Sequence, residues 1–176
     1  MNSMDLTLIK NITDLTSPTD QTDLLMIAEF NISGQDFKKA GEASFEIKTR
    51  LKRLGIPPDL IRRVATATYE GELNVIIYAQ KGKMKVCVED NCVDVTIDDV
   101  GPGIPNIPLA MQEGYSTAPP HVKQLGYGSG MGLPNIKKNT DWMDIQSVVD
   151  GGTTLRFKVN LRTGDRQKEK GIRPKA

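Results

Sequence analysis

Residues 99–133 read DVGPGIPNIPLAMQEGYSTAPPHVKQLGYGSGMGL, and the fold prediction depends on this stretch. Its glycines gather at both ends, in residues 101–103 and in residues 126–132. Glycines at alternate positions weaken a helix or strand because glycine loses the most backbone entropy on folding. The first cluster directly follows a strand-like run, and the second leads into a helix-like run. This arrangement indicates a ligand held by backbone amides beneath a mobile lid.

The strand before the first cluster alternates between apolar and polar residues. Its odd-numbered positions, from Val93 to Ile97, are apolar, and continuing the period of two places Asp99 on the same buried face. A carboxylate at the end of a buried face needs a hydrogen-bond donor or a pocket mouth. Asp99 is therefore a candidate functional residue, with a turn or cap aspartate as the alternative. The same count places Thr153 on the apolar face of the last strand.

The rest of the chain is expected to form a small set of helices and strands around these motifs. In order, we expect a strand at 24–32, a helix at 37–54 capped by Asp36 and ended by Gly55, a helix at 57–79, a turn at 81–83, strands at 84–89 and 93–98, a short helix at 106–113, an aperiodic segment at 115–125, a helix at 133–140, and strands at 142–149 and 153–161.

Glu70 and Asn74 lie within the second expected helix, in the run Glu-Gly-Glu-Leu-Asn. Their spacing of four residues projects both side chains from one helix face, about one turn apart. The intervening Glu72 points elsewhere. A solvated polar face explains such a pair equally well when it is taken alone, because glutamate and asparagine are usually exposed.

Length and composition indicate one domain and exclude several classes of partner. The 176 residues suggest a single domain at 24–161, with a polar arm at 1–23 that is poorly ordered and a disordered charged tail at 162–176. The net charge of +1 gives no case for a nucleic-acid or membrane partner. The sequence shows neither a signal peptide nor an apolar run of roughly 18 residues. With only Cys87 and Cys92, a reduced cytoplasmic protein is the simplest interpretation.

The glycines do not fit the common nucleotide motifs. The chain has no GxxxxGK[ST], which excludes a P-loop protein. A GxGxxG starting at Gly126 or Gly128 would need glycine at Met131 or Leu133, so the dinucleotide fingerprint also fails. The eukaryotic-type protein-kinase motifs VAIK, HRD and DFG are absent as well.

Four motifs in order instead resemble the GHKL, or Bergerat-fold, ATP-binding family. They are ExxxN at Glu70–Asn74, DxGxG at Asp99, Gly101 and Gly103, GxGxGL at Gly128, Gly130, Gly132 and Leu133 with Gly126 before it, and GT at Gly152–Thr153. The resemblance covers residues 24–161 and implies an α+β two-layer sandwich. In such a sandwich, a mixed, mostly antiparallel sheet carries helices on one face. The short chain is most similar to the bacterial anti-sigma-factor and switch serine/threonine kinases.

The resemblance also implies roles for particular residues. Asp99 would hold the adenine amino group of ATP, with help from Thr153 through water. Asn74 would bind Mg²⁺, and Glu70 would orient or deprotonate the attacking hydroxyl. The phosphates would lie against the second glycine box, which spans Gly126, Gly128, Gly130, Met131, Gly132 and Leu133.

Three functions are compatible with this resemblance. The leading hypothesis is a serine/threonine kinase that phosphorylates a STAS-type (anti-anti-sigma) regulator and switches partners, among them a sigma factor or a phosphatase. The second is a nucleotide-dependent module that binds an anti-sigma target or another regulator without significant turnover. The third is a histidine-kinase-like catalytic domain acting in trans. The position of His121 argues against it, because this histidine lies in the expected lid and not in a helical phosphoacceptor motif. A homodimer is compatible with all three.

Overall fold

The computed structural model describes residues 25–89 and 91–161, so the expected arm and tail lie outside the described residues. Five strands form one sheet in the order β1-β2-β3-β5-β4. Their bounds are Leu25–Ser33 for β1, Lys81–Val88 for β2, Cys92–Val100 for β3, Trp142–Val148 for β4 and Gly152–Asn160 for β5. Every strand pairing in the described part is antiparallel, so the sheet is simpler than the mixed one expected.

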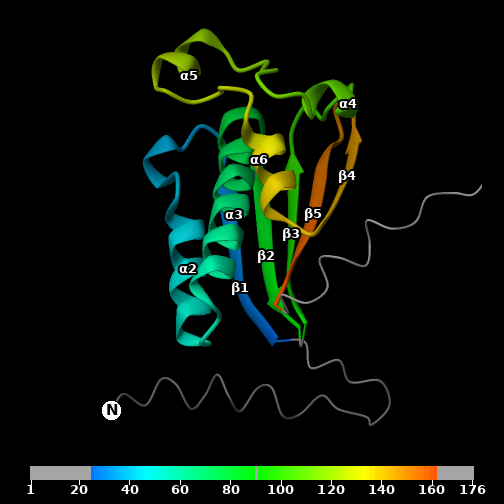
Figure 1. The fold of residues 1–176 in the computed structure, drawn as a ribbon. Coiled ribbons are helices and arrows are strands. Elements are labelled where there is room, and N and C mark those ends of the chain that lie inside the picture. The colour runs from blue at the N-terminus through cyan, green and yellow to red at the C-terminus, as the bar shows by residue number, and fades with distance from the viewer. Residues whose placement is uncertain (1–24, 90, 162–176) are drawn as a thin grey trace, which may run out of the picture.

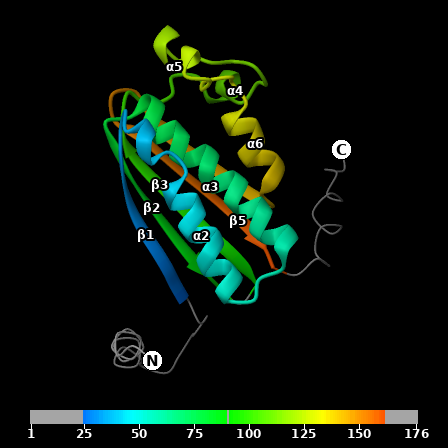
Figure 2. The same ribbon diagram turned by 90° about the vertical axis from the view of Figure 1, so that its left-hand side faces the viewer.

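The helices cover one face of this sheet, which gives the α+β two-layer sandwich expected (Figure 1). They are the 3₁₀ helix η1 at Phe37–Lys39, α2 at Glu42–Arg53, α3 at Pro58–Tyr78, α4 at Ile107–Ala110, α5 at Pro120–Gln124 and α6 at Gly132–Asn139. Figure 2 shows α2, α3 and α6 over the sheet, with α4 and α5 gathered at one end. Within the described residues, no helix is both long and apolar enough to cross a membrane.

The period of two in the strands is confirmed by burial. Val95 pairs with Phe157 and Ile97 pairs with Leu155, and all four side chains are buried beneath the helices. Asp98 lies on the opposite, exposed face, where its carboxylate accepts a hydrogen bond from Thr154 at 2.7 Å. The alternation therefore predicted correctly which face of the sheet forms the core.

The first helix is shorter than predicted. The run from Phe37 forms only η1, and Asp36 makes no side-chain cap. Gly41 then adopts a φ of 94°, in the left-handed region, and α2 begins at Glu42. A left-handed residue cannot continue a right-handed helix, so the periodic apolar residues are divided between two helices. Gly55, with a φ of 74°, follows the end of α2 as expected.

Two other predictions were wrong. Residues 81–83 are not a turn but the first part of β2, because Lys81 pairs with both Ser33 and Val100. The turn lies earlier, at Ala79 and Gln80. The aperiodic segment 115–125 contains the short helix α5, whose five residues are too few to show a helical period.

Glu72 caps the shortened helix from a distance in sequence. Its side chain is only 3% exposed, and its two carboxylate oxygens accept hydrogen bonds from the backbone N–H groups of Ala43 and Ser44, at 3.2 and 3.3 Å. These N–H groups have no partner within α2. Burial raises the pKa of Glu72, and the hydrogen bonds oppose that rise. Glu72 thus joins the N-terminus of α2 to α3.

Replacing this cap is expected to weaken the fold. Glu72→Leu leaves the two N–H groups without an acceptor and should lower the free energy of unfolding by about 1–2 kcal/mol. Glu72→Gln keeps one acceptor oxygen and removes a buried charge, so its loss should be smaller. Urea unfolding of both variants checks this, and equal losses in the two would show that the carboxylate does not act as a cap.

Candidate functional site

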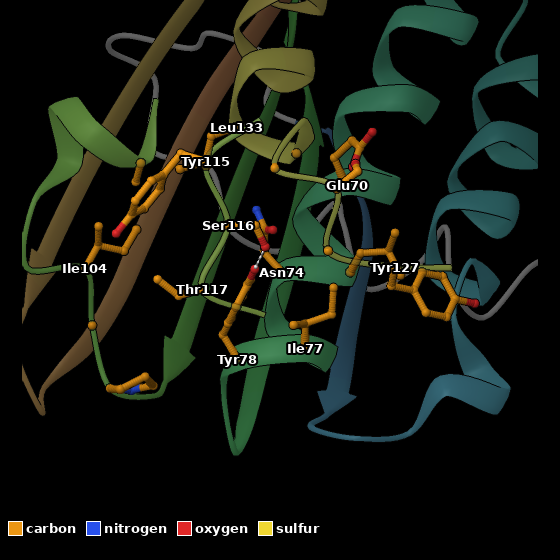
Figure 3. A pocket seen from close by; sticks show the side chains of 18 of the residues that line it. Glu70, Asn74, Ile77, Tyr78, Ile104, Tyr115, Ser116, Thr117, Tyr127 and Leu133 are labelled. Carbon is orange, nitrogen blue, oxygen red and sulfur yellow. Dashed lines mark hydrogen bonds between the residues drawn. The ribbon is translucent and has the colours of Figure 1, made fainter. Parts of the chain in front are cut away.

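A pocket of about 370 Å³ opens between α3, the segment 102–117 and the second glycine cluster (Figure 3). Eight of the residues predicted from the motifs line it: Glu70, Asn74, Gly103, Gly126, Gly128, Gly130, Gly132 and Leu133. Four do not line it: Asp99, Gly101, Met131 and Thr153. The volume lies within the range typical of small-molecule sites.

Two side-chain oxygens meet at the start of α6. Glu70 and Asn74 extend from successive turns of α3, and a Cβ atom added at Gly132 would lie 3.1 Å from Asn74 Oδ1 and 3.6 Å from Glu70 Oε2. Gly132 is the first residue of α6, where backbone N–H groups have no partner within the helix. A helix N-terminus attracts anions, and the neighbouring oxygens suit a cation bound to such an anion.

The second glycine cluster needs glycine for two reasons. Gly128 and Gly130 have φ angles of 74° and 77°, a conformation that other residues rarely adopt. A Cβ atom at Gly130 would also collide with the backbone of Gly114 and would lie 2.6 Å from the carbonyl oxygen of Tyr115. The Gly114 N–H donates to the Gly130 carbonyl at 3.0 Å, so the cluster packs directly on the middle of the lid, which spans residues 104–125.

The lid, residues 104–125, is held against α3 and η1. Val122 and Ala118 are buried against Leu73 and Ile77 of α3. Next to this apolar contact, the rings of Phe37 and Tyr127 stack with centroids 5.4 Å apart. Inside the pocket the hydroxyls of Tyr78 and Ser116 lie 3.4 Å apart, as the dashed line in Figure 3 shows. The lid therefore packs over the pocket through its own apolar anchor.

The end of β3 carries a separate polar cluster. Asp99 Oδ1 accepts a hydrogen bond from the Thr153 N–H at 3.2 Å, and the Thr153 and Ser147 hydroxyls lie 2.8 Å apart. Ser147 Oγ also accepts from the N–H of Ile104 at 2.8 Å. Because Ile104 also lines the pocket, it joins this cluster to the pocket wall.

Close backbone packing holds Asp99 in place. A Cβ atom at Gly152 would collide with the Asp99 carbonyl oxygen, and one at Gly101 would lie 2.9 Å from Asp99 Oδ1. Burial raises the pKa of Asp99, and the Thr153 N–H opposes the rise. Within the described residues, Asp99 Oδ2 has no hydrogen-bond partner, which leaves it available to a donor group on a ligand.

Sequence reasoning missed several residues of this region. Leu73 and Ile77 line the pocket at positions three and seven after Glu70, so helical periodicity could have found them. No local signal marks Ser116, which comes from the aperiodic segment, or Tyr127, which lies between two glycines of the second cluster. Ser147 also carries no local signal, since its role depends on β5 and on the loop after β3.

A family model described as histidine kinase-, DNA gyrase B- and HSP90-like ATPase matches residues 59–163, more than half of the chain. The chain belongs to this ATPase family. The matched residues include all four motifs that resemble the GHKL family, so this resemblance is confirmed. The α+β sandwich is the fold that the resemblance predicted.

Individual proteins are also similar to this chain in sequence or in structure. The serine/threonine-protein kinase RsbT of Bacillus subtilis is 33% identical over 109 residues, covering 60% of this chain and 76% of RsbT. The anti-sigma F factor of Priestia megaterium is 30% identical over 134 residues, covering 72% of this chain and 84% of that protein. Among solved structures, the mycobacterial sensor histidine kinase MprB matches with a TM-score of 0.46 and 15% identity, over 76% of this chain and 97% of that chain.

The residues of the pocket and of the Asp99 cluster beside it fit the nucleotide that the ATPase family implies. The glycine cluster presents backbone at the N-terminus of α6, where phosphates would be received. Asn74 supplies an amide oxygen beside that point, the kind of ligand that Mg²⁺ takes together with phosphate oxygens. At the end of β3, Asp99 supplies an acceptor for an amino group.

A substitution in the glycine cluster tests this fit. Gly130→Ala adds a methyl group that collides with the lid backbone, whereas a Cβ at Gly126 meets nothing within 4 Å. Both positions have positive φ, so both variants carry a similar left-handed penalty of about 1–2 kcal/mol. Gly130→Ala should therefore weaken ATP binding at least about ten-fold more than Gly126→Ala, as measured by calorimetry, where ten-fold corresponds to about 1.4 kcal/mol. Similar affinities for the two variants would contradict the proposed packing of cluster on lid.

Proposed function

We propose that the chain is an ATP-dependent serine/threonine protein kinase that phosphorylates a STAS-type regulator and switches partners by doing so. The convergence of Glu70 and Asn74 on the N-terminus of α6 carries the proposal. It unites a carboxylate, an amide oxygen and free backbone N–H groups at one end of the pocket. The similarity to RsbT, whose name is that of a serine/threonine kinase, supports the same activity. We assign the kinase domain to residues 24–161.

ATP and Mg²⁺ are the cofactors of this proposal. Asp99 would accept the adenine amino group through Oδ2, and Thr153, which lies against Asp99 and Ser147, would support it. Met131 and Leu133 flank Gly132, one of the glycines that would receive the phosphates. Mg²⁺ held by Asn74 would neutralise charge on the phosphates during transfer. Phosphoryl transfer depends mostly on positioning and charge stabilisation, so a small set of residues is sufficient.

Glu70 has the role of a general base in this reaction. Its carboxylate would accept the proton of a serine or threonine hydroxyl on the partner protein while that oxygen attacks the γ-phosphorus. The bond from the γ-phosphorus to the bridging oxygen of ATP breaks, and ADP leaves with the electron pair. Glu70 Oε2 faces the start of α6, where the phosphates would be held.

The proposal is tested by incubating the purified chain with Mg²⁺, ATP labelled at the γ-phosphate, and the STAS-domain protein of the same organism. We expect label on the STAS protein that is stable in acid, as phosphoserine and phosphothreonine are. Acid-labile label would identify a histidine-kinase-like activity instead. If no label is transferred to any STAS protein tested, the kinase proposal is wrong.

The similarity to anti-sigma F factor favours a second candidate, a nucleotide-dependent module that binds a sigma factor or another regulator with little turnover. The two candidates differ in how they depend on Glu70. A kinase loses its output when Glu70 is replaced by glutamine, whereas a binding module keeps its affinity for the partner and its biological effect. Measuring partner affinity with and without ATP in both proteins distinguishes them.

A further inference from the structure

Asn135 makes a hydrogen bond to Glu70 that no motif predicts. Its Nδ2 donates to Glu70 Oε1 at 2.7 Å, a short contact in a partly buried setting. An ionised carboxylate only accepts hydrogen bonds, so the amide must present its nitrogen. Hydrogen bonds to a charged acceptor are about twice as strong as those between neutral groups. The contact therefore restricts the rotation of the Glu70 side chain.

The position of Asn135 connects Glu70 to the expected phosphate site. Asn135 lies in the first turn of α6, three residues after Gly132, and its backbone N–H donates to the Met131 carbonyl at 2.8 Å. With Oε1 occupied by Asn135, the other oxygen, Oε2, is the one that faces Gly132. The two carboxylate oxygens thus have different surroundings, and only one is directed at the N-terminus of α6.

We propose that Asn135 is the positioning residue for Glu70. From α6 it holds the Glu70 carboxylate of α3, so that Oε2 is directed at the reacting hydroxyl. This rests on the proposed kinase function and extends it to a residue outside the motifs. Asn135 and the backbone that would receive the phosphates belong to the same turn of α6. Asn135 contacts Glu70 and is not among the residues that line the pocket, so we assign it a role that acts through Glu70.

Asn135→Leu tests the role by removing the donor while keeping similar side-chain volume. We expect kcat for phosphoryl transfer to fall about ten- to a hundred-fold, with the dissociation constant for ATP changed less than about three-fold. Asn135→Gln, which retains an amide, should restore part of kcat. Asn139→Leu is the matched control: it lies one turn further along α6 and donates to the Asn135 carbonyl instead of to Glu70, so its kcat should stay near the native value.

A double-mutant cycle separates positioning from a purely structural role. If Asn135 acts through Glu70, then Asn135→Leu causes no further loss in a Glu70→Gln background. Equal losses in both backgrounds, an unchanged kcat in Asn135→Leu, or an effect confined to ATP affinity would each overturn the proposal. Urea unfolding of every variant identifies losses that come from destabilisation.

Two readouts need no protein acceptor and keep this proposal distinct from the kinase proposal. If the kinase substrate is wrong but Glu70 still activates the nucleophile, the slow hydrolysis of ATP by water should follow the same double-mutant cycle. Asn135→Leu should then lower the hydrolysis rate in the native chain but not in the Glu70→Gln variant. In NMR spectra, the Asn135 side-chain amide protons should shift upfield in Glu70→Ala, because the charged acceptor is lost. The positioning role would be rejected, whatever the kinase assay shows, by two results together. These are an unchanged Asn135 amide signal in Glu70→Ala and an unchanged rate of ATP hydrolysis in Asn135→Leu.

Discussion

Asp99→Asn is expected to bind ATP much more weakly than the native chain while the fold is retained. The ionised carboxylate has two acceptor oxygens, one used by the Thr153 N–H and one available to the adenine amino group. Asparagine offers one acceptor oxygen and one NH₂ donor, so it cannot accept from both. Losing a charged hydrogen bond of this kind costs about 1.5–3 kcal/mol, or roughly 10- to 150-fold in affinity. Calorimetric titration measures the loss, and native affinity in the variant would overturn the assignment of Asp99.

The same variant should be at least as stable as the native chain without nucleotide. Burial raises the pKa of Asp99, so the folded chain still holds this proton at pH values where the unfolded chain, with a pKa near 3.9, has lost it. The contribution of Asp99 to the free energy of unfolding therefore falls as the pH rises through this window, and above it the ionised group destabilises the fold. Asp99→Asn removes that term. A lower unfolding midpoint for Asp99→Asn at pH 7 would show that structural damage explains its loss of ATP.

Glu70→Gln is expected to slow phosphoryl transfer strongly while leaving ATP and partner binding close to native. Glutamine keeps Oε1 as an acceptor for Asn135, but it replaces Oε2 with an NH₂ group that cannot take a proton. General-base catalysis contributes about 10²- to 10⁴-fold, so the rate should fall by that factor. Single-turnover transfer from labelled ATP measures it.

The control for this variant is Glu29→Gln. Glu29 lies on β1, pairs with Lys83 and is not among the residues that line the pocket. It should keep the native rate. A Glu70→Gln variant that transfers phosphate at the native rate would exclude Glu70 as the base, and the function would then depend on positioning by the glycine cluster alone.

Local patterns in the sequence predicted the five strands, apart from residues 81–83 at the start of β2, and the face of the sheet that is buried. Alternation alone distinguished Asp98 from Asp99, and the structure places Asp98 on the exposed face and Asp99 against Thr153. Helical spacing likewise brought Glu70 and Asn74 to one side of α3. These features depend on neighbours within a few residues, which is the range over which periodicity carries information.

Features that depend on distant partners could not be predicted in this way. Helical spacing predicts that Glu72 points away from Glu70 and Asn74, but it does not predict that Glu72 caps α2, from residues 28 and 29 positions away. Asn135 lies 65 residues from Glu70, and Ser147 meets Ile104 across 43 residues. A polar side chain that finds its partner in another element leaves no local pattern, so tertiary structure is needed to identify it.

We expect the pocket to bind the phosphates of ATP with Mg²⁺, and the neighbouring Asp99 cluster to recognise the adenine amino group. This expectation is tested most directly by calorimetric titration of the native chain with ATP, with and without Mg²⁺, and with inosine triphosphate, which has a carbonyl where adenine has the amino group. We expect one ATP bound per chain, tighter binding with Mg²⁺, and at least about ten-fold weaker binding of inosine triphosphate. Equal affinity for the two nucleotides would contradict the role of Asp99, and no binding of either would contradict ATP binding by this chain.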